Sequence, residues 1–139
     1  MGGGIGQDQL DALFTAALEA AIARIERDGS FFPLLFELRA NGAIQNVAVL
    51  ETAAIDGSQS VLDRLAELLR PRIAEGLVEA AAIAVHDPEG EAVELQLRAP
   101  NFSADVTAPY AIETTGLLRR RRSLALGAFT VRPAPNELF

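Results

Sequence analysis

The sequence predicts an α+β domain, with a mainly antiparallel sheet of about six strands and two helices packed on one face of it. Two segments carry apolar residues at helical spacing, and six segments have the alternation or composition of strands. The expected order along the chain is α-β-β-α-β-β-β-β. Because short turns join successive strands, we expect antiparallel neighbours, with both helices covering the same apolar face.

Residues 8–28 form the first predicted helix, because apolar residues recur there three or four positions apart. Asp8 is placed to cap its start. Gly29 is placed to end it, since glycine readily takes the left-handed backbone of a helix C-terminus. The apolar stripe consists of Leu10, Leu13, Phe14, Ala17, Leu18, Ala21, Ile22 and Ile25.

Residues 58–75 form the second predicted helix, which has a leucine-rich apolar stripe. Asp56 or Ser58 is the expected cap. Pro71 lacks a backbone N–H, so we expect it to end the helix, kink it or open a short second helix.

A β-hairpin is predicted over residues 30–39 and 43–52. Asn41-Gly42 lies between them and is typical of a two-residue type I′ turn, in which both positions have a positive φ. This turn sets an expected register in which cross-strand partners share a face. The facing pairs are Ala40–Ala43, Phe36–Val47 and Leu34–Val49.

A second hairpin is predicted over residues 79–87 and 91–99. Asp87-Pro88-Glu89-Gly90 fits a type I turn with Gly90 as the bulge residue. The expected facing pairs on one side are all apolar, namely Val85–Val93, Ile83–Leu95 and Ala81–Leu97. The other side joins small residues to polar ones, namely His86–Ala92, Ala84–Glu94, Ala82–Gln96 and Ala80–Arg98.

Residues 102–114 and 123–132 are the last two predicted strands. The first alternates apolar and polar side chains, as expected of a strand with one buried face. With them, the predicted strands number six.

The chain of 139 residues has the length of one domain, so we expect a single α+β domain over 1–139. Residues 1–7, rich in glycine, are an expected disordered lead-in. Residues 133–139 form a tail too rich in proline for a regular element. Leu138 and Phe139 at its end are placed to pack as a clip.

The composition excludes several classes of site. Without cysteine and with a single histidine, one chain builds no disulfide, no thiolate site and no site of two imidazoles. We therefore expect no metal and no cofactor. All 12 cationic residues are arginine, and the net charge of −7 disfavours general nucleic-acid binding.

The composition also indicates the type of organism and the cellular location. All-arginine, alanine-rich usage is typical of a GC-rich bacterial genome. No apolar run approaches the roughly 20 residues that cross a bilayer, and the N-terminal residues lack the pattern of a signal peptide. We expect a cytoplasmic protein with no membrane partner.

His86 and Glu94 are the candidates for catalysis. Histidine is the side chain that ordinarily titrates near neutral pH, and a neighbouring carboxylate orients it as a general base. The expected register places the two residues diagonally on one face. The alternative is a histidine at a strand end with a purely structural role, and no motif supplies a nucleophile.

The arginine run is the candidate anion site. Clustered guanidinium groups bind phosphate or carboxylate, although alternate side chains of an extended run point in opposite directions. The alternative is a solvated turn whose arginines pair with carboxylates of this chain or of a second copy. The run consists of Arg119, Arg120, Arg121 and Arg122.

The outward face of the second hairpin is the candidate interface, with Ala80, Ala82, Ala84 and Gln96 as its residues. A row of alanines allows close approach of another surface, and exposed sheet edges invite pairing with a second chain. The alternative is that one of the helices covers the row.

Together these features predict a small non-enzymatic binding or interaction protein that self-associates as a homodimer, with a further protein partner as an option. A small hydrolase using His86, and anion or nucleic-acid contact through the arginine run, are the two alternatives.

Overall fold

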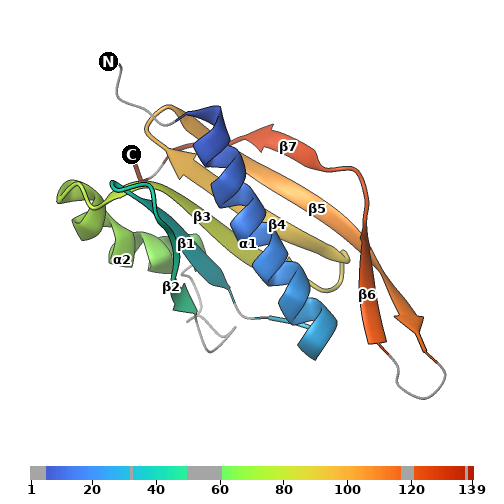
Figure 1. The fold of residues 1–139 in the computed structure, drawn as a ribbon. Coiled ribbons are helices and arrows are strands. Elements are labelled where there is room, and N and C mark those ends of the chain that lie inside the picture. Colours follow the sequence, from blue (N-terminus) through green and yellow to red (C-terminus); the bar gives the residue numbers. More distant parts are fainter. Residues whose placement is uncertain (1–5, 32, 50–60, 117–120, 137) are drawn as a thin grey trace.

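In the part of the chain that it describes, the computed structural model has two helices and seven strands (Figure 1). The structure describes residues 6–31, 33–49, 61–116, 121–136 and 138–139. The elements in chain order are α1 (Gln7–Asp28), β1 (Leu34–Arg39), β2 (Ile44–Val49), α2 (Val61–Ala74), β3 (Val78–Asp87), β4 (Ala92–Ala99), β5 (Phe102–Thr115), β6 (Arg121–Leu126) and β7 (Thr130–Pro133). The predicted α+β class and antiparallel sheet are confirmed.

The sheet runs in the order β2-β1-β3-β4-β5-β6, and every pairing is antiparallel. β7 pairs with the first half of β5, and β6 pairs with the second half. The predicted strand 123–132 is thus two strands, because pairing with β5 is interrupted between Leu126, which pairs with Tyr110, and Thr130, which pairs with Thr107.

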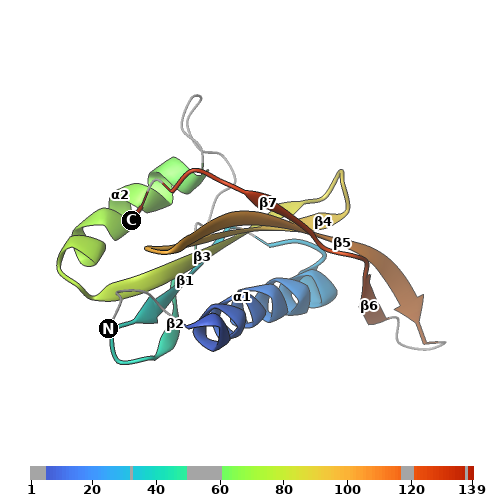
Figure 2. The same cartoon turned by 90° about the horizontal axis from the view of Figure 1, so that it is seen from above.

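The two helices lie on opposite faces of the sheet (Figure 2), so the expectation that both cover one face is wrong. α1 packs on the side of β3 that carries Ala82, and α2 packs on the side that carries Ala81 and Ile83. The physical reason lies in β1 and β3, which are apolar on both faces and therefore need a cover on each side.

The first hairpin has a three-residue loop in place of the predicted type I′ turn. The Arg39 N–H donates to the Ala43 carbonyl at 2.8 Å, and Gly42 has a φ of +88° while Asn41 has a negative φ. A bulge between Leu35 and Phe36 then restores the expected pairing at the far end. The pairs are Leu34–Val49, Leu35–Ala48, Phe36–Asn46, Glu37–Gln45 and Leu38–Ile44.

The predicted register of the second hairpin is wrong by one residue. Glu91, with a φ of +48°, takes the left-handed position expected for Gly90, so the loop is one residue longer. Asp87 consequently pairs with Ala92, and His86 with Val93. Matching of apolar partners could not select the register, because the structure buries residues on both faces of β3.

The helix ends agree in part with the predictions. Gly6 is the N-cap of α1, with its N–H donating to the Gln9 side chain at 3.1 Å, while Asp8 lies in the first turn. Gly29 ends the helix with a φ of +84°, as expected. Pro71 lies within α2, which continues to Ala74. The predicted caps of α2, at positions 56 and 58, lie outside the described residues.

The C-terminal tail packs against α2. Leu138 is buried with Leu65 and Leu69, and Phe139 packs beside them. The Asn136 side chain ties the tail to the sheet by donating to the Ala99 carbonyl at 2.7 Å. Residues 1–5 of the predicted lead-in are outside the described part, and Gln7 already belongs to α1.

Candidate functional site

His86 is part of an aromatic cluster on the face that α1 covers. Its ring stacks on those of Phe31 and Tyr110, with centroid distances of 5.3 and 6.0 Å. Its Nε2 lies 2.7 Å from the Tyr110 hydroxyl. Burial lowers the pKa of His86, and the charge of Asp87 acts in the opposite direction. The imidazole is therefore neutral at pH 7 and joins β3 to β5.

Glu94 lies on the other face of the sheet, so the predicted pair is not brought together. His86 pairs with Val93, the residue before Glu94, and neighbours along a strand point to opposite faces. Glu94 instead accepts a hydrogen bond from the Thr107 hydroxyl at 2.7 Å and forms an ion pair with Arg132 at 3.3 Å. The Glu94 carboxylate therefore cannot contact the His86 imidazole, which lies on the opposite face of the sheet.

Two members of the arginine run, Arg119 and Arg120, lie outside the described residues. Arg121 and Arg122 open β6, where their backbones pair with Thr115 and Thr114. β5 and β6 together form an arm that extends from the main sheet (Figure 1).

The alanine row of the candidate interface is buried under α1. Ala80, Ala82 and Ala84 are fully buried in the core that α1 forms with the sheet. Gln96 lies on the opposite face, and its side-chain oxygen is buried without a hydrogen-bond partner. The structure therefore has the alternative arrangement, in which a helix covers the row.

No group of three or more histidine and carboxylate side chains gathers as a metal site within the part of the chain that the structure describes. Neither described helix is both long and apolar enough to cross a membrane.

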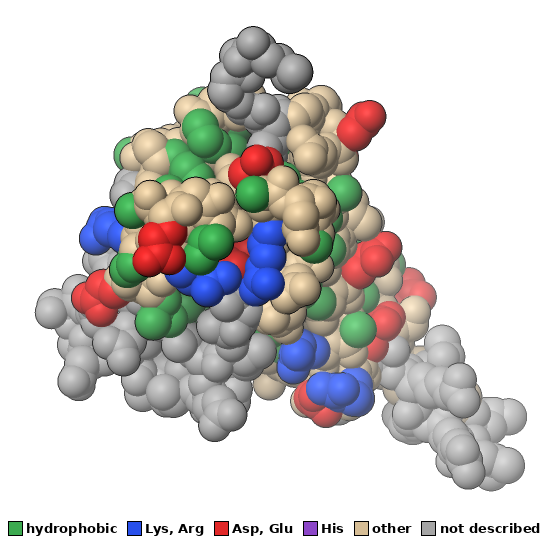
Figure 3. Space-filling model, turned by 60° about the vertical axis from the view of Figure 1, so that its left-hand side comes forward, with side chains coloured by type: hydrophobic (Ala, Val, Ile, Leu, Met, Phe, Trp, Pro, Cys, Tyr) green, Lys and Arg blue, Asp and Glu red, His purple; other side chains and the backbone are tan. Residues whose placement is uncertain are grey.

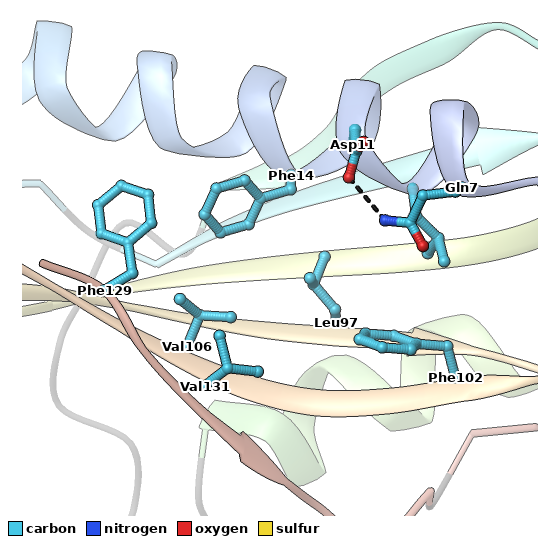
Figure 4. Close-up of a pocket in the computed structure, with 9 residues that line it drawn as sticks. Gln7, Asp11, Phe14, Leu97, Phe102, Val106, Phe129 and Val131 are labelled. Carbon is cyan, nitrogen blue, oxygen red and sulfur yellow. Dashed lines mark hydrogen bonds between the residues drawn. The ribbon is translucent and has the colours of Figure 1, made fainter.

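An apolar groove between α1 and β7 was not predicted. It holds about 190 Å³, and Figure 4 shows side chains from α1 facing those of the sheet across it. At one end, the rings of Phe14 and Phe129 meet edge to face with their centroids 5.8 Å apart. A space of this size exceeds the ~150 Å³ that is enough for a benzene-sized group. The lining consists of Gln7, Leu10, Asp11, Phe14, Leu97, Phe102, Val106, Phe129 and Val131.

The groove is part of a longer apolar strip on the α1 side of β5, β6 and β7. Of the seven exposed large hydrophobic residues in the described chain, five belong to it, and two lie elsewhere, at Leu68 and Leu77. Register places four of them on one face, because Val131 pairs with Val106 and Leu126 with Tyr110, both facing α1. The fifth, Phe129, reaches the same face through its ring contact with Phe14. The apolar strip consists of Phe102, Ile112, Leu126, Phe129 and Val131.

The strip is exposed because α1 is too narrow to cover the sheet. Neighbouring strands lie about 4.8 Å apart, so a path of six strands is roughly 24 Å wide, whereas a helix is about 10 Å across. α1 packs over β1, β3, β4 and β6, and the middle of β5 is buried in the same core, whereas Phe102 and Ile112 near the two ends of β5 and Val131 of β7 remain exposed.

Carboxylates border the strip on the α1 side. Asp11 lines the groove and accepts a hydrogen bond from the Gln7 side chain at 2.8 Å. Near the other end of the helix, Glu26 accepts the backbone N–H of Leu124 at 3.0 Å, which ties β6 to α1. The strip is thus an apolar surface with an acidic edge.

Comparisons with protein-family models, with curated proteins and with solved structures found no match.

Proposed function

We propose that the protein is a binding module that docks an amphipathic, basic helix of a partner polypeptide on the apolar strip beside α1. One observation carries the proposal: five of the seven exposed large hydrophobic residues of the described chain gather on this strip. Scattered exposed apolar residues are ordinary, whereas a contiguous exposed patch is typical of an interaction site.

A helix fits the strip better than other partners do. The exposed apolar side chains of the strip lie beside α1, and a second helix packed on them would extend the helical layer on that face. Its apolar stripe would fill the groove between Phe14 and Val131. α1 has 22 residues, so a partner helix of about the same length would span roughly 33 Å of sheet.

The charge of the partner follows from that of this chain. The net charge is −7, and the α1 edge of the strip carries Asp11 and Glu26. Complementary charge speeds encounter and sets orientation, so a helix with lysines or arginines along its flank fits this edge. The composition also supports placing the protein in the cytoplasm of a GC-rich bacterium.

Titration with a labelled model helix tests the proposal. The probe is a fluorescein-labelled leucine/lysine peptide of about five turns, compared with a leucine/glutamate peptide of the same pattern. We expect saturable anisotropy changes with the lysine peptide, and binding weaker by about tenfold, or 1.4 kcal/mol, with the glutamate peptide. Equal binding of both peptides, or of neither, contradicts the proposal.

A matched pair of variants places the binding on the strip. Phe129→Ser removes an aromatic ring that is 42% exposed and lines the groove, and Leu68→Ser removes an apolar side chain that is 49% exposed on α2. We expect the first to weaken binding at least fivefold, or about 1 kcal/mol, and the second to leave it unchanged. Equal effects would show that the peptide binds any exposed apolar residue.

A second copy of this chain is the alternative occupant of the strip. Two copies that buried their strips against each other would form the homodimer expected from the sequence. Sedimentation equilibrium distinguishes the two cases. A monomer that binds the lysine peptide supports the proposal, and a dimer that Phe129→Ser dissociates assigns the strip to a second copy instead.

A further inference from the structure

A second cavity lies where the β1–β2 turn meets the connection from α2 to β3. It holds about 470 Å³ and shares no lining residue with the groove beside α1. Figure 3 views this side of the molecule, where cationic side chains lie side by side near the middle of the face with apolar side chains next to them. The lining residues are Arg39, Ala40, Asn41, Arg72 and Leu77.

Two guanidinium groups of this cavity share one carboxylate. Glu37 is fully buried, and Arg72 donates to both of its oxygens from Nε and Nη2, at 2.8 and 2.9 Å. Arg39 adds an ion pair, with its Nε 3.4 Å from a Glu37 oxygen, but this Nε is buried without a hydrogen-bond partner. One positive charge is therefore left over in the cluster of three side chains.

Asn41 adds a hydrogen-bond donor. Its Oδ1 accepts the backbone N–H of Ala43 at 3.0 Å. Because that N–H only donates, it fixes the orientation of the amide, and Nδ2 remains available at the cavity. Both Nη groups of Arg39 and the Nη1 of Arg72 also make no hydrogen bond within the described chain. The unused side-chain groups at this cavity are all donors.

We infer that this cavity binds a small organic anion that has one carboxylate and an apolar body. Side chains whose unused groups only donate favour a ligand group that accepts, and guanidinium groups match a carboxylate in shape and charge. Leu77, which is 45% exposed, and Ala40 offer apolar surface for the rest of the ligand. The site is independent of the groove proposed to bind a helix.

The local charge favours a single carboxylate over a phosphate dianion. Glu37, Arg39 and Arg72 together leave one positive charge. Hydrogen bonds to Glu37 are the chief cause of the raised pKa of Arg72. The charge of Glu75, which is exposed nearby, raises this pKa weakly as well. This extra carboxylate reduces the positive field that a dianion needs.

Nuclear magnetic resonance titration of the full chain with hexanoate tests the inference. We expect saturable shifts of the backbone amides of residues 39–43 and of Leu77 at low salt, and weaker binding as salt is added. Hexylamine has the same apolar body with a positive charge, and we expect it to shift none of these amides. Inorganic phosphate is expected to bind more weakly than hexanoate.

Two substitutions are designed to remove donors and keep the contacts that hold the local fold. Asn41→Asp retains the oxygen that accepts the Ala43 N–H and replaces the free donor with a negative charge. Arg39→Gln retains the Arg72–Glu37 pair. We expect each to weaken hexanoate binding by about tenfold or more. The control is Arg70→Gln, on an exposed arginine of α2 that does not line the cavity, which should change affinity less than twofold.

The outcomes decide the inference either way. Loss of binding in Asn41→Asp, with the unfolding temperature retained, supports it. Unchanged binding in Asn41→Asp overturns it even if Arg39→Gln fails to fold. Phosphate that binds the same amides more tightly than hexanoate overturns the assignment to an apolar carboxylate.

Discussion

The Nε2 of His86 and the hydroxyl of Tyr110 are 2.7 Å apart, in a hydrogen bond that links β3 to β5 across β4. Burial lowers the pKa of His86 and raises that of Tyr110, so both groups are neutral at pH 7. The hydrogen bond therefore joins two uncharged side chains. The Phe31 ring stacks on the imidazole. The only histidine of the chain is thus partly buried on the α1 face, beside the core.

Acidification should destabilise the protein through His86. A lowered pKa in the folded state means that the unfolded chain binds the proton more readily. The stability is thus fully present above the ordinary pKa of about 6.5 and is lost as pH falls through the lower, folded value. We expect the free energy of unfolding to decrease between about pH 7.5 and pH 5.5, and to decrease less in His86→Phe. Denaturant unfolding of both proteins checks this, and equal slopes would exclude His86 as the cause.

Removal of Asp105 should destabilise β4 and β5. Arg98 is 1% exposed, and its Nη1 donates to Asp105 at 2.9 Å as well as to the carbonyls of Leu97 and Ala104. Asp105→Asn takes a negative charge away from a buried cation, so we expect a loss of roughly 2–3 kcal/mol.

A more exposed ion pair on the same face provides the control for Asp105. Arg132, which is 49% exposed, pairs with Glu94. Arg132→Ala should cost less than about 1 kcal/mol. Comparable losses in the two variants, measured by denaturant unfolding, would mean that burial of Arg98 does not set the cost.

Enlargement of the alanine row should destabilise the fold, because α1 already occupies that space. Ala82 is fully buried between α1 and the sheet. Ala82→Leu is expected to cost about 1–3 kcal/mol through overpacking. Ala125→Leu, at an exposed position of β6, should change stability by about 0.5 kcal/mol or less. A harmless Ala82→Leu in thermal unfolding would mean that the row is open and available to a partner.

Local sequence patterns were sufficient to predict most of the helices and strands. The stripe from Leu10 to Ile25 and the glycine at position 29 predicted α1 to within one residue. The alternation of residues 102–114 predicted β5 nearly as well. Such signals depend on neighbours in the chain, and they remain valid whatever packs on the sheet.

The arrangement of faces depended on contacts that are distant in sequence. Ala81 and Ala82 are both buried, under different helices, so no pattern of polarity along β3 shows which helix covers which side. The one-residue error in the second hairpin has the same origin, since Glu91 takes a left-handed backbone where glycine was expected.

The groove was missed because its walls come from four elements and a connection between strands. Phe14 is in α1 and Val131 in β7, which are more than a hundred residues apart in the chain. Treating 123–132 as a single strand hid the connection between β6 and β7 that carries Phe129. Two features could have indicated the strip. Residues 102–114 alternate and so form an apolar face, and one helix is too narrow to cover a sheet of this width.

Hydrogen–deuterium exchange with and without the leucine/lysine peptide tests the central claim most directly, because it locates the bound helix on the chain. The account predicts slower exchange in the first half of α1, in β5 and across residues 126–133, with no change in α2. Slower exchange confined to α2 and the β1–β2 turn, or no change anywhere, would contradict docking of a helix on the apolar strip.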